Sequence, residues 1–206
     1  MRADAQRNLD KIVIAAAEVV AEQGVGAPMK LIARRAGVGV GTLYRRFPDR
    51  ESLIAAIGEY YVESLTEALR RAAERAPDAW SGLRAFVLWA AEEGRGALAT
   101  ALAGLPEDAF RGDAGFARKR REWYGLLDRL VERTRDDGTL RAGVVTEDVV
   151  ALLELFTCHP GDLPSRVAAD PGRFLRLMLD GFRTEAAAPF TPPPPTLWDA
   201  PPGPVS

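Results

Sequence analysis

The stretch "IARRAGVGVGTLYRRFPDRESL", Ile32 to Leu53, contains the strongest structural signal in this 206-residue chain. Glycines occupy positions 37, 39 and 41, between two short segments of helix-forming residues. Glycine readily adopts the left-handed backbone that ends a helix, so the stretch predicts two short helices joined by a tight turn, a helix-turn-helix. The second helix carries a hydroxyl, a phenol and two arginines, a combination suited to an acidic partner.

The composition is that of a globular chain. Apolar residues make up 47% of it, enough for a sizeable core, and no apolar run approaches the length that spans a bilayer. The first residues are polar and include acids, which argues against a secretory signal. The single cysteine, Cys158, excludes an internal disulfide and suits a reducing compartment. We therefore expect a cytoplasmic protein without membrane association.

Charge divides the chain unevenly. Residues 1–50 carry nine basic side chains against five acidic ones, whereas residues 51–206 carry eighteen against twenty-four. A basic unit ahead of an acidic body fits a nucleic-acid-binding head, although such a split also arises by chance on solvated helices.

Periodicity indicates an all-α fold, because strand patterns are almost absent and apolar residues recur at helical spacing. Gly24, Gly37 and Pro48 end the first three segments, and Asp49 is suited to cap the fourth. The expected helices, about nine, lie near 9–22, 29–36, 40–47, 52–75, 79–94, 95–104, 113–137, 146–158 and 170–187.

Within the opening stretch, the apolar positions of the two short helices are expected to face inward and lock them together. A hydroxyl and a phenol on the outer face can donate to phosphate oxygens, and arginines neutralise a phosphate backbone. Arg50, in the first turn of the next helix, opposes the helix dipole, so a phosphate contact is its expected role. The outward residues are Val40, Thr42, Tyr44, Arg45 and Arg46.

Residues 7 to about 60 resemble the DNA-binding domain of TetR-family transcriptional repressors. The resemblance rests on "AAAEVVAEQGVGAP", "IARRAGV", "GVGTLYRRF" and "PDRESL", and it extends to "DDGTLRAGVVTEDVVALLELF" and "RFLRLMLDGFR". It implies a ligand-responsive repressor that binds double-stranded operator DNA as a homodimer and responds to a small-molecule effector. By this resemblance Val40, Gly41 and Tyr44 reach base edges, Thr42, Arg45, Arg46 and Arg50 meet phosphates, and Lys30 touches DNA from the preceding helix.

One position departs from the family pattern. Members often begin the second helix with a Ser or Thr that caps it and meets phosphate, whereas this chain has Ala27, Pro28 and Met29. The resemblance divides the chain into a helix-turn-helix domain at 1–50, with the connecting helix reaching to about 66, and a ligand-binding and dimerisation domain at 51–188. Residues 189–206 hold eight prolines in eighteen positions and are expected to form a disordered or polyproline tail.

The C-terminal body is expected to hold a largely apolar, partly aromatic effector and to form the dimer. For each aromatic residue taken alone, ordinary core packing remains an alternative. The pocket candidates are Phe86, Trp89, Phe110, Phe116, Trp123, Tyr124, Leu127 and Phe156. The interface candidates are Val149, Val150, Leu152, Leu153 and Phe156 on one helix and Phe174, Leu175, Leu177, Met178, Leu179 and Phe182 on another, with a charge at Leu175 or Phe182 expected to separate the subunits.

Other chemistry is weakly supported. Cys158 and His159 are adjacent, but they have no second Cys/His cluster, so neither a catalytic pair nor a metal site is expected, and no cofactor is implied. "RKRRE", Arg118 to Glu122, is better explained as a solvated helix face than as a second nucleic-acid patch. Two further classes stay open: an interaction adaptor that uses the proline-rich tail, and an enzyme on a helical bundle.

Overall fold

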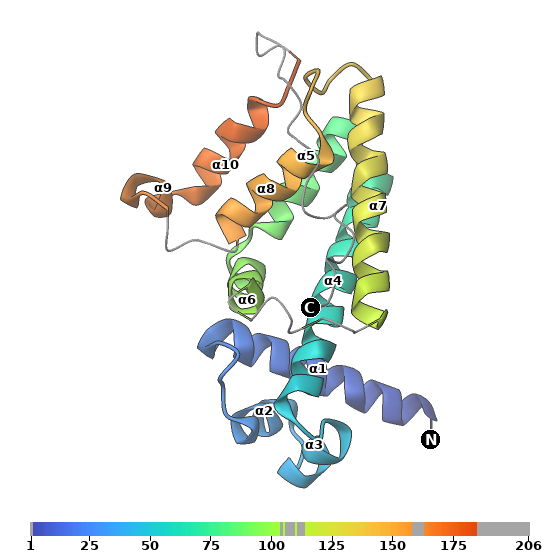
Figure 1. Ribbon diagram of the computed structural model, residues 1–206, viewed down its shortest axis with the longest axis vertical. Helices are drawn as coiled ribbons and strands as arrows, with labels where there is room; N and C mark the ends of the chain where they lie inside the picture. Colours follow the sequence, from blue (N-terminus) through green and yellow to red (C-terminus); the bar gives the residue numbers. More distant parts are fainter. Residues whose placement is uncertain (1, 104, 106–109, 111–113, 158–162, 185–206) are drawn as a thin grey trace, which may run out of the picture.

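The computed structural model describes residues 2–103, 105, 110, 114–157 and 163–184. Ten helices make up this part of the chain, with one isolated bridge between Leu140 and Arg183 (Figure 1). The prediction of an all-helical fold is therefore confirmed. The helices are α1 (Arg2–Gln23), α2 (Met29–Ala36), α3 (Val40–Arg46), α4 (Arg50–Arg75), α5 (Ala79–Ala90), α6 (Glu93–Ala103), α7 (Ala114–Asp136), α8 (Thr146–Thr157), α9 (Ser165–Ala169) and α10 (Pro171–Asp180).

Local sequence signals set many of the helix ends. Gly37 and Gly138 adopt left-handed backbone, with φ of 68° and 70°, at the ends of α2 and α7. Asp49 caps α4 by accepting from the Ser52 N–H at 2.8 Å, as predicted. Asp78 caps α5 in the same way, through the Ser81 N–H at 2.7 Å. These ends depend on residues next to the helix, which explains why the sequence indicates them.

The C-terminal part differs from the prediction of one helix at 170–187. Pro171 occupies the first turn of α10, where its missing N–H does no harm, and Asp170 caps that helix by accepting from Arg173 N at 3.0 Å. A separate short helix, α9, precedes it. The described chain therefore has ten helices rather than about nine, and residues 185–187 of the predicted helix lie outside the described part.

The described helices pack into two hydrophobic clusters joined by α4. The first cluster includes Ile12 of α1, Ile32 of α2, Leu43 of α3 and Ile57 of α4. The second joins the later part of α4 to α5, α7, α8 and α10. Figure 1 shows α1, α2 and α3 at one end of the molecule, around the first turns of α4, with α9 and α10 far from them. We call α1–α3 the head and α5–α10 the body; α4 runs through both.

Ion pairs fasten α7 alongside α4. Lys119 lies 2.8 Å from a carboxylate oxygen of Glu59 and 3.1 Å from one of Glu63. Partial burial lowers the pKa of Lys119. The hydrogen bonds and charges of the two glutamates outweigh this effect, so the pKa is raised overall. These pairs hold α7 to the middle of α4, the same segment that borders the cavity described below.

None of the described helices is both long and apolar enough to cross a membrane. Cys158, His159 and the proline-rich segment 189–206 lie outside the described residues.

Candidate functional site

The turn between α2 and α3 has the geometry that the glycines predict. The N–H of Gly37 donates to the Arg34 carbonyl at 3.2 Å, and the N–H of Val38 donates to the Ala33 carbonyl at 3.0 Å. Gly39 then provides the extended residue before α3, and its carbonyl accepts from Thr42 N at 2.9 Å. The two short helices are thereby closed by backbone hydrogen bonds, without side-chain caps.

One side of α3 anchors the helix and the other side is exposed. Leu43 is fully buried, whereas Tyr44 is 47% exposed and Val40 is also exposed. Arg46 is exposed and makes no hydrogen bond or ion pair with the described residues, while Arg45 Nε donates to the Gly41 carbonyl at 3.2 Å. The free donors on this surface can meet phosphate oxygens or base edges.

The remaining predicted contacts fall around this surface. Lys30 is exposed on α2, Gly41 is exposed, and Thr42 is half-buried. Seven of the predicted DNA-contacting residues thus lie on α2 and α3, which Figure 1 places at one end of the molecule. We call this set the α2–α3 surface: Lys30, Val40, Gly41, Thr42, Tyr44, Arg45 and Arg46.

Arg50, the eighth predicted contact, is differently placed. Its Nη1 donates to the Val25 carbonyl at 2.7 Å and to the Ala27 carbonyl at 2.8 Å, and these bonds are partly buried. The guanidinium therefore faces the loop between α1 and α2, an arrangement that the sequence pattern does not reveal.

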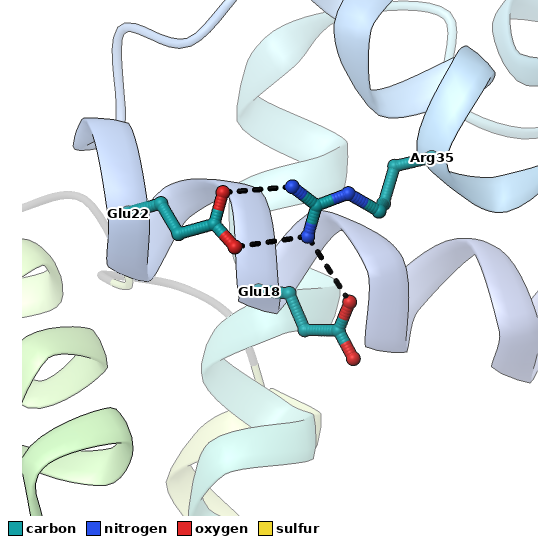
Figure 2. A network of polar contacts seen from close by, with 3 residues as sticks. All are labelled: Glu18, Glu22 and Arg35. Atoms are coloured by element: carbon teal, nitrogen blue, oxygen red, sulfur yellow. Dashed lines mark hydrogen bonds and ion pairs between the residues drawn. The ribbon is translucent and has the colours of Figure 1, made fainter.

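Arg35, which also belongs to the stretch Ile32 to Leu53, makes its contacts with side chains of the protein itself. Figure 2 shows the guanidinium of Arg35, on α2, forming paired contacts with the carboxylate of Glu22 and a further contact with Glu18, both on α1. The two Glu22 bonds measure 2.9 and 2.7 Å. The Arg35 hydrogen bond is the main cause of a lowered Glu22 pKa. This contact fixes α2 against α1, behind the exposed surface.

A cavity of about 240 Å³ lies in the body. Its walls come from α4, α5, α6, α7, α8 and Phe110, and they are mainly aliphatic and aromatic. Of the predicted pocket residues, Phe110, Phe116, Trp123 and Tyr124 line it. An apolar cavity of this kind is the usual setting for a small-molecule site.

The other four pocket candidates do not line this cavity. Phe86 and Leu127 are fully buried and fill the core, as does Phe156, which is 7% exposed. Trp89 borders a groove elsewhere, between the end of α4 and α5. Helical spacing identified inward-facing residues, but it could not distinguish those packed against neighbours from those beside empty space.

Helix α4 also contributes to the cavity wall, although no residue of α4 was among the predicted pocket residues. Tyr61, Val62 and Leu65 line the cavity. They continue the apolar stripe that begins at Leu53 and Ile57, so the helical period contained a usable signal. One helix thus reaches from the head to the cavity wall.

A stacked aromatic pair lines the cavity and packs against Gly58 of α4. The rings of Phe110 and Phe116 lie 4.2 Å apart with an interplanar angle of 15°. They fit against Gly58, where an added Cβ would stand 2.5 Å from a Phe110 ring carbon and 3.2 Å from Phe116. The missing side chain at 58 therefore makes room for this pair.

Polar groups at the cavity are few. Arg120 and Glu154 both line it, and burial lowers the pKa of the Arg120 guanidinium while Glu154 opposes that shift. The indole N–H of Trp123 is buried and has no hydrogen-bond partner among the described residues. Buried donors are normally paired, so this one stands out.

The predicted dimer residues separate into core and surface positions. On α10, Leu177 is 55% exposed and Met178 is also exposed, and so is Leu155 of α8, which was not among the predicted residues. Met178 and Leu155 border a common groove. Phe174 and Phe182 are half-buried. The other candidates are buried inside the protomer: Val149, Val150, Leu152, Leu153, Phe156, Leu175 and Leu179.

Two family models match the sequence. The model of bacterial regulatory proteins of the tetR family matches residues 12–57, the head and the first turns of α4. The model of the SbtR-like transcriptional regulator C-terminal domain matches residues 75–184, more than half of the chain. No curated protein sequence gives a significant match.

Solved structures show the same fold. A TetR transcription regulatory protein from Mycobacterium vanbaalenii is 29% identical, with 88% of this chain and 98% of that chain covered and a TM-score of 0.66. A TetR transcriptional regulator from Streptomyces coelicolor is 31% identical, with 84% and 97% covered and a TM-score of 0.61. The transcriptional regulator FadR from Bacillus subtilis, solved in complex with stearoyl-CoA, is 18% identical, with 84% of this chain and 98% of that chain covered and a TM-score of 0.59. The chain belongs to the TetR family of bacterial regulatory proteins and is a DNA-binding transcriptional regulator.

Proposed function

We propose that the protein is a cytoplasmic repressor whose dimer binds an operator through the α2–α3 surface and is released by a small, largely apolar molecule. The observation that supports this most is the path of α4. Its first turn contacts the loop before α2 through Arg50, and its middle lines the cavity through Tyr61, Val62 and Leu65. A ligand that moves this helix would act on both ends.

The proposed DNA contacts follow from exposure and charge. Arg46 and Lys30 are exposed cations, and Tyr44 carries an exposed phenol beside them. Val40 and Gly41 supply no hydrogen bonds to base edges, so direct readout is sparse and DNA shape carries much of the specificity. Tyr44 and Lys30 are the side chains left to discriminate sequence.

The DNA-binding test starts from a duplex that the parent protein enriches from a random-sequence pool. Affinity is then measured by fluorescence anisotropy between about 50 and 200 mM salt. Arg46→Gln should weaken binding and lower the slope of log affinity against log salt by about 0.9, one phosphate contact. Tyr44→Ala should weaken binding as well. Arg133→Gln, an exposed arginine on α7, is the matched control and should leave both quantities unchanged. If Arg46→Gln and Tyr44→Ala both bound DNA as tightly as the parent protein, α3 would not be part of the DNA interface.

The cavity favours a compact ligand. Its volume of about 240 Å³ lies just below the range of roughly 300–1,000 Å³ typical of pockets for drug-sized molecules. An engineered apolar cavity of about 150 Å³ holds benzene, so one or two fused rings is a reasonable size here. A hydrogen-bond acceptor on the ligand would suit the guanidinium of Arg120 and the indole N–H of Trp123, both of which belong to residues of the cavity wall.

Release requires differential affinity. A complete reversal of the DNA-competent population needs about 5.5 kcal/mol of preference for the released state. By reciprocity, operator DNA must weaken ligand binding by the same factor. An aromatic panel beginning with indole and 2-naphthol can be titrated by tryptophan fluorescence with and without the operator duplex. A compound that binds equally well in both cases is not the effector.

The structure provides a matched pair for this titration. Trp123 lines the cavity, whereas Trp89 borders a separate groove. Trp123→Ala should change both ligand affinity and release, and Trp89→Ala should change neither. The reverse result would move the ligand site to the groove beside α5. An operator-fused reporter then distinguishes a repressor, which lowers expression without ligand, from an activator.

TetR regulators act as dimers, and we propose that this chain pairs through the exposed side of α8 and α10. Leu155, Leu177 and Met178 supply the apolar contact there. Exposed apolar side chains grouped on one face commonly mark a subunit contact. The seven buried candidates belong to the core beneath α8 and α10.

A further inference from the structure

Arg50 is a cation at the first position of a helix, where it opposes the helix dipole. Asp49 already caps α4, so the arginine is not needed for that purpose. Instead, its Nη1 donates to two carbonyl oxygens, those of Val25 at 2.7 Å and Ala27 at 2.8 Å, located 25 and 23 residues earlier in the chain. The first turn of α4 is thereby bound to the loop between α1 and α2.

Ala27 and Val25 of that loop pack against the head core, but few other hydrogen bonds hold its backbone. α2 is preceded by Pro28, which makes no side-chain cap hydrogen bond. Within the loop, the N–H of Ala27 donates to the Gly24 carbonyl at 3.2 Å. No backbone N–H of the described residues donates to the carbonyl of Val25 or Ala27. Because Ala27 itself is buried, its carbonyl has restricted access to water, and Arg50 provides the missing donor.

We propose that Arg50 is a positioning residue: it binds the α1–α2 loop and thereby sets the placement of α2 and the α2–α3 surface, and it does not hold a phosphate. This inference rests on the proposed function, in which that surface contacts DNA. Arg46 is the contrasting case, since it is exposed and makes no hydrogen bond or ion pair with the described residues. Arg46 thus supplies positive charge to the DNA, and Arg50 orients the helices that carry this charge.

The position of Arg50 on α4 adds a regulatory consequence. Tyr61 and Leu65 of the cavity wall lie 11 and 15 residues further along the same helix, about 16 and 22 Å at 1.5 Å per residue. A displacement of α4 at the cavity reaches α2 directly through the Arg50 contacts. The loop follows α4 because its carbonyls are bound to that helix.

The test compares Arg50→Gln with Arg46→Gln in the full chain. Hydrogen–deuterium exchange of residues 24–31 is measured without DNA, because a phosphate contact has no influence on the free protein. Arg50→Gln should raise exchange of this segment, and Arg46→Gln should leave it at the parent level. Circular dichroism checks that both variants remain helical. Arg50→Lys serves as a second variant if the first fails to fold, since it keeps the charge on a shorter side chain.

DNA binding supplies the second readout, with the duplex enriched from the random pool. Losing charge-assisted bonds to the loop should lower the affinity of Arg50→Gln about tenfold. Its salt slope should stay at the parent value, because the loop can still be drawn into place in the complex and no phosphate contact is lost. Arg46→Gln should lower that slope by about 0.9. Arg50→Lys should show raised exchange of residues 24–31 despite its charge.

Two results would overturn the proposal. One is hydrogen–deuterium exchange of residues 24–31 at the level of the parent protein in both Arg50→Gln and Arg50→Lys. The other is a slope of log affinity against log salt that is lowered by about 0.9 in Arg50→Gln. The second result would make Arg50 a phosphate contact. Failure of the proposed function looks different. In that case Arg46→Gln and Tyr44→Ala bind DNA as tightly as the parent protein, and the hydrogen–deuterium exchange of residues 24–31 has no bearing on that result.

Discussion

The head and the body carry their candidate sites in opposite ways. On α2 and α3 the side chains proposed to meet DNA project outward, and the buried Leu43 and Ile32 hold the helices from behind. In the body the candidate site is an internal cavity, and residues of its wall, such as Leu65 and Leu153, belong to the hydrophobic core. Function and stability are therefore separable in the head and coupled in the body.

Shared residues explain this coupling. Removing an exposed side chain from α3 leaves the packing beneath it intact, whereas removing a cavity-wall residue enlarges a space inside the core. α4 belongs to both regions, through Arg50 and Ile57 at one end and Leu65 further along. A substitution on α4 is consequently the type most able to affect DNA binding and stability together.

The largest expected effect is in the body core. Phe86→Ala should lower the free energy of unfolding by about 3–5 kcal/mol, because Phe86 is fully buried and a cavity would replace its ring. Tyr44→Ala, on the exposed head surface, should change the free energy of unfolding by no more than about 0.5 kcal/mol. Urea unfolding measures both. A Phe86→Ala loss as small as that of Tyr44→Ala would end the distinction between the two regions.

The proposed subunit contact should also separate two neighbouring leucines. Leu177→Glu places a charge in the contact and should yield a folded monomer, at a cost of about 3 kcal/mol to the dimer. Leu175 is 1% exposed within the protomer, so Leu175→Glu should unfold the body rather than only dissociate it. Sedimentation combined with circular dichroism distinguishes these outcomes. A folded dimer for Leu177→Glu would place the interface elsewhere.

Gly58→Ala tests the cavity from the α4 side. The new Cβ would crowd the Phe110 ring, which should cost about 1–3 kcal/mol, less the roughly 1 kcal/mol that alanine gains over glycine in a helix. The result is a modest net loss of stability, with a displaced aromatic pair and altered binding of the aromatic panel. Gly125→Ala on α7, where the nearest atom is 3.7 Å away, is the control and should be neutral or stabilising. Identical behaviour of the two variants would mean that the pair moves freely.

The same division limits what the sequence predicts. The bounds of α2 and the turn at Gly37 depend on residues within a few positions, so the pattern indicates them directly. The exposed and buried sides of α3 follow from the period of a single helix, as Leu43 and Tyr44 illustrate. Local information is sufficient for most of the head.

The body depends on distances that a pattern does not contain. Phe86 and Trp123 are both aromatic residues on helices of the body, yet Phe86 fills the core and Trp123 lines the cavity. The difference arises because five helices together determine where the cavity lies. The two carbonyls that Arg50 binds lie 25 and 23 residues away in the sequence, so no local pattern contains that contact. The start of α10 is the exception in the body, since Pro171 and the capping Asp170 are local signals and the helix predicted from 170 begins there.

The smallest expected effect belongs to the head and depends on pH. The Arg35 hydrogen bond lowers the pKa of Glu22 from its ordinary value of 4.5, with partial desolvation opposing the shift and the charge of Arg35 adding to it. Because the folded-state pKa is depressed, the stabilisation is complete above the unfolded-state pKa and is lost as pH falls through the folded value. The parent should therefore melt slightly above Glu22→Gln at pH 7, and the two melting temperatures should converge as pH drops below about 4.5. Glu74→Gln, an exposed carboxylate on α4, is the control and should show no such convergence. A melting difference that stays constant down to acid pH would show that the Glu22 carboxylate does not stabilise α2 through its charge, and that the exposed contact is largely screened by solvent.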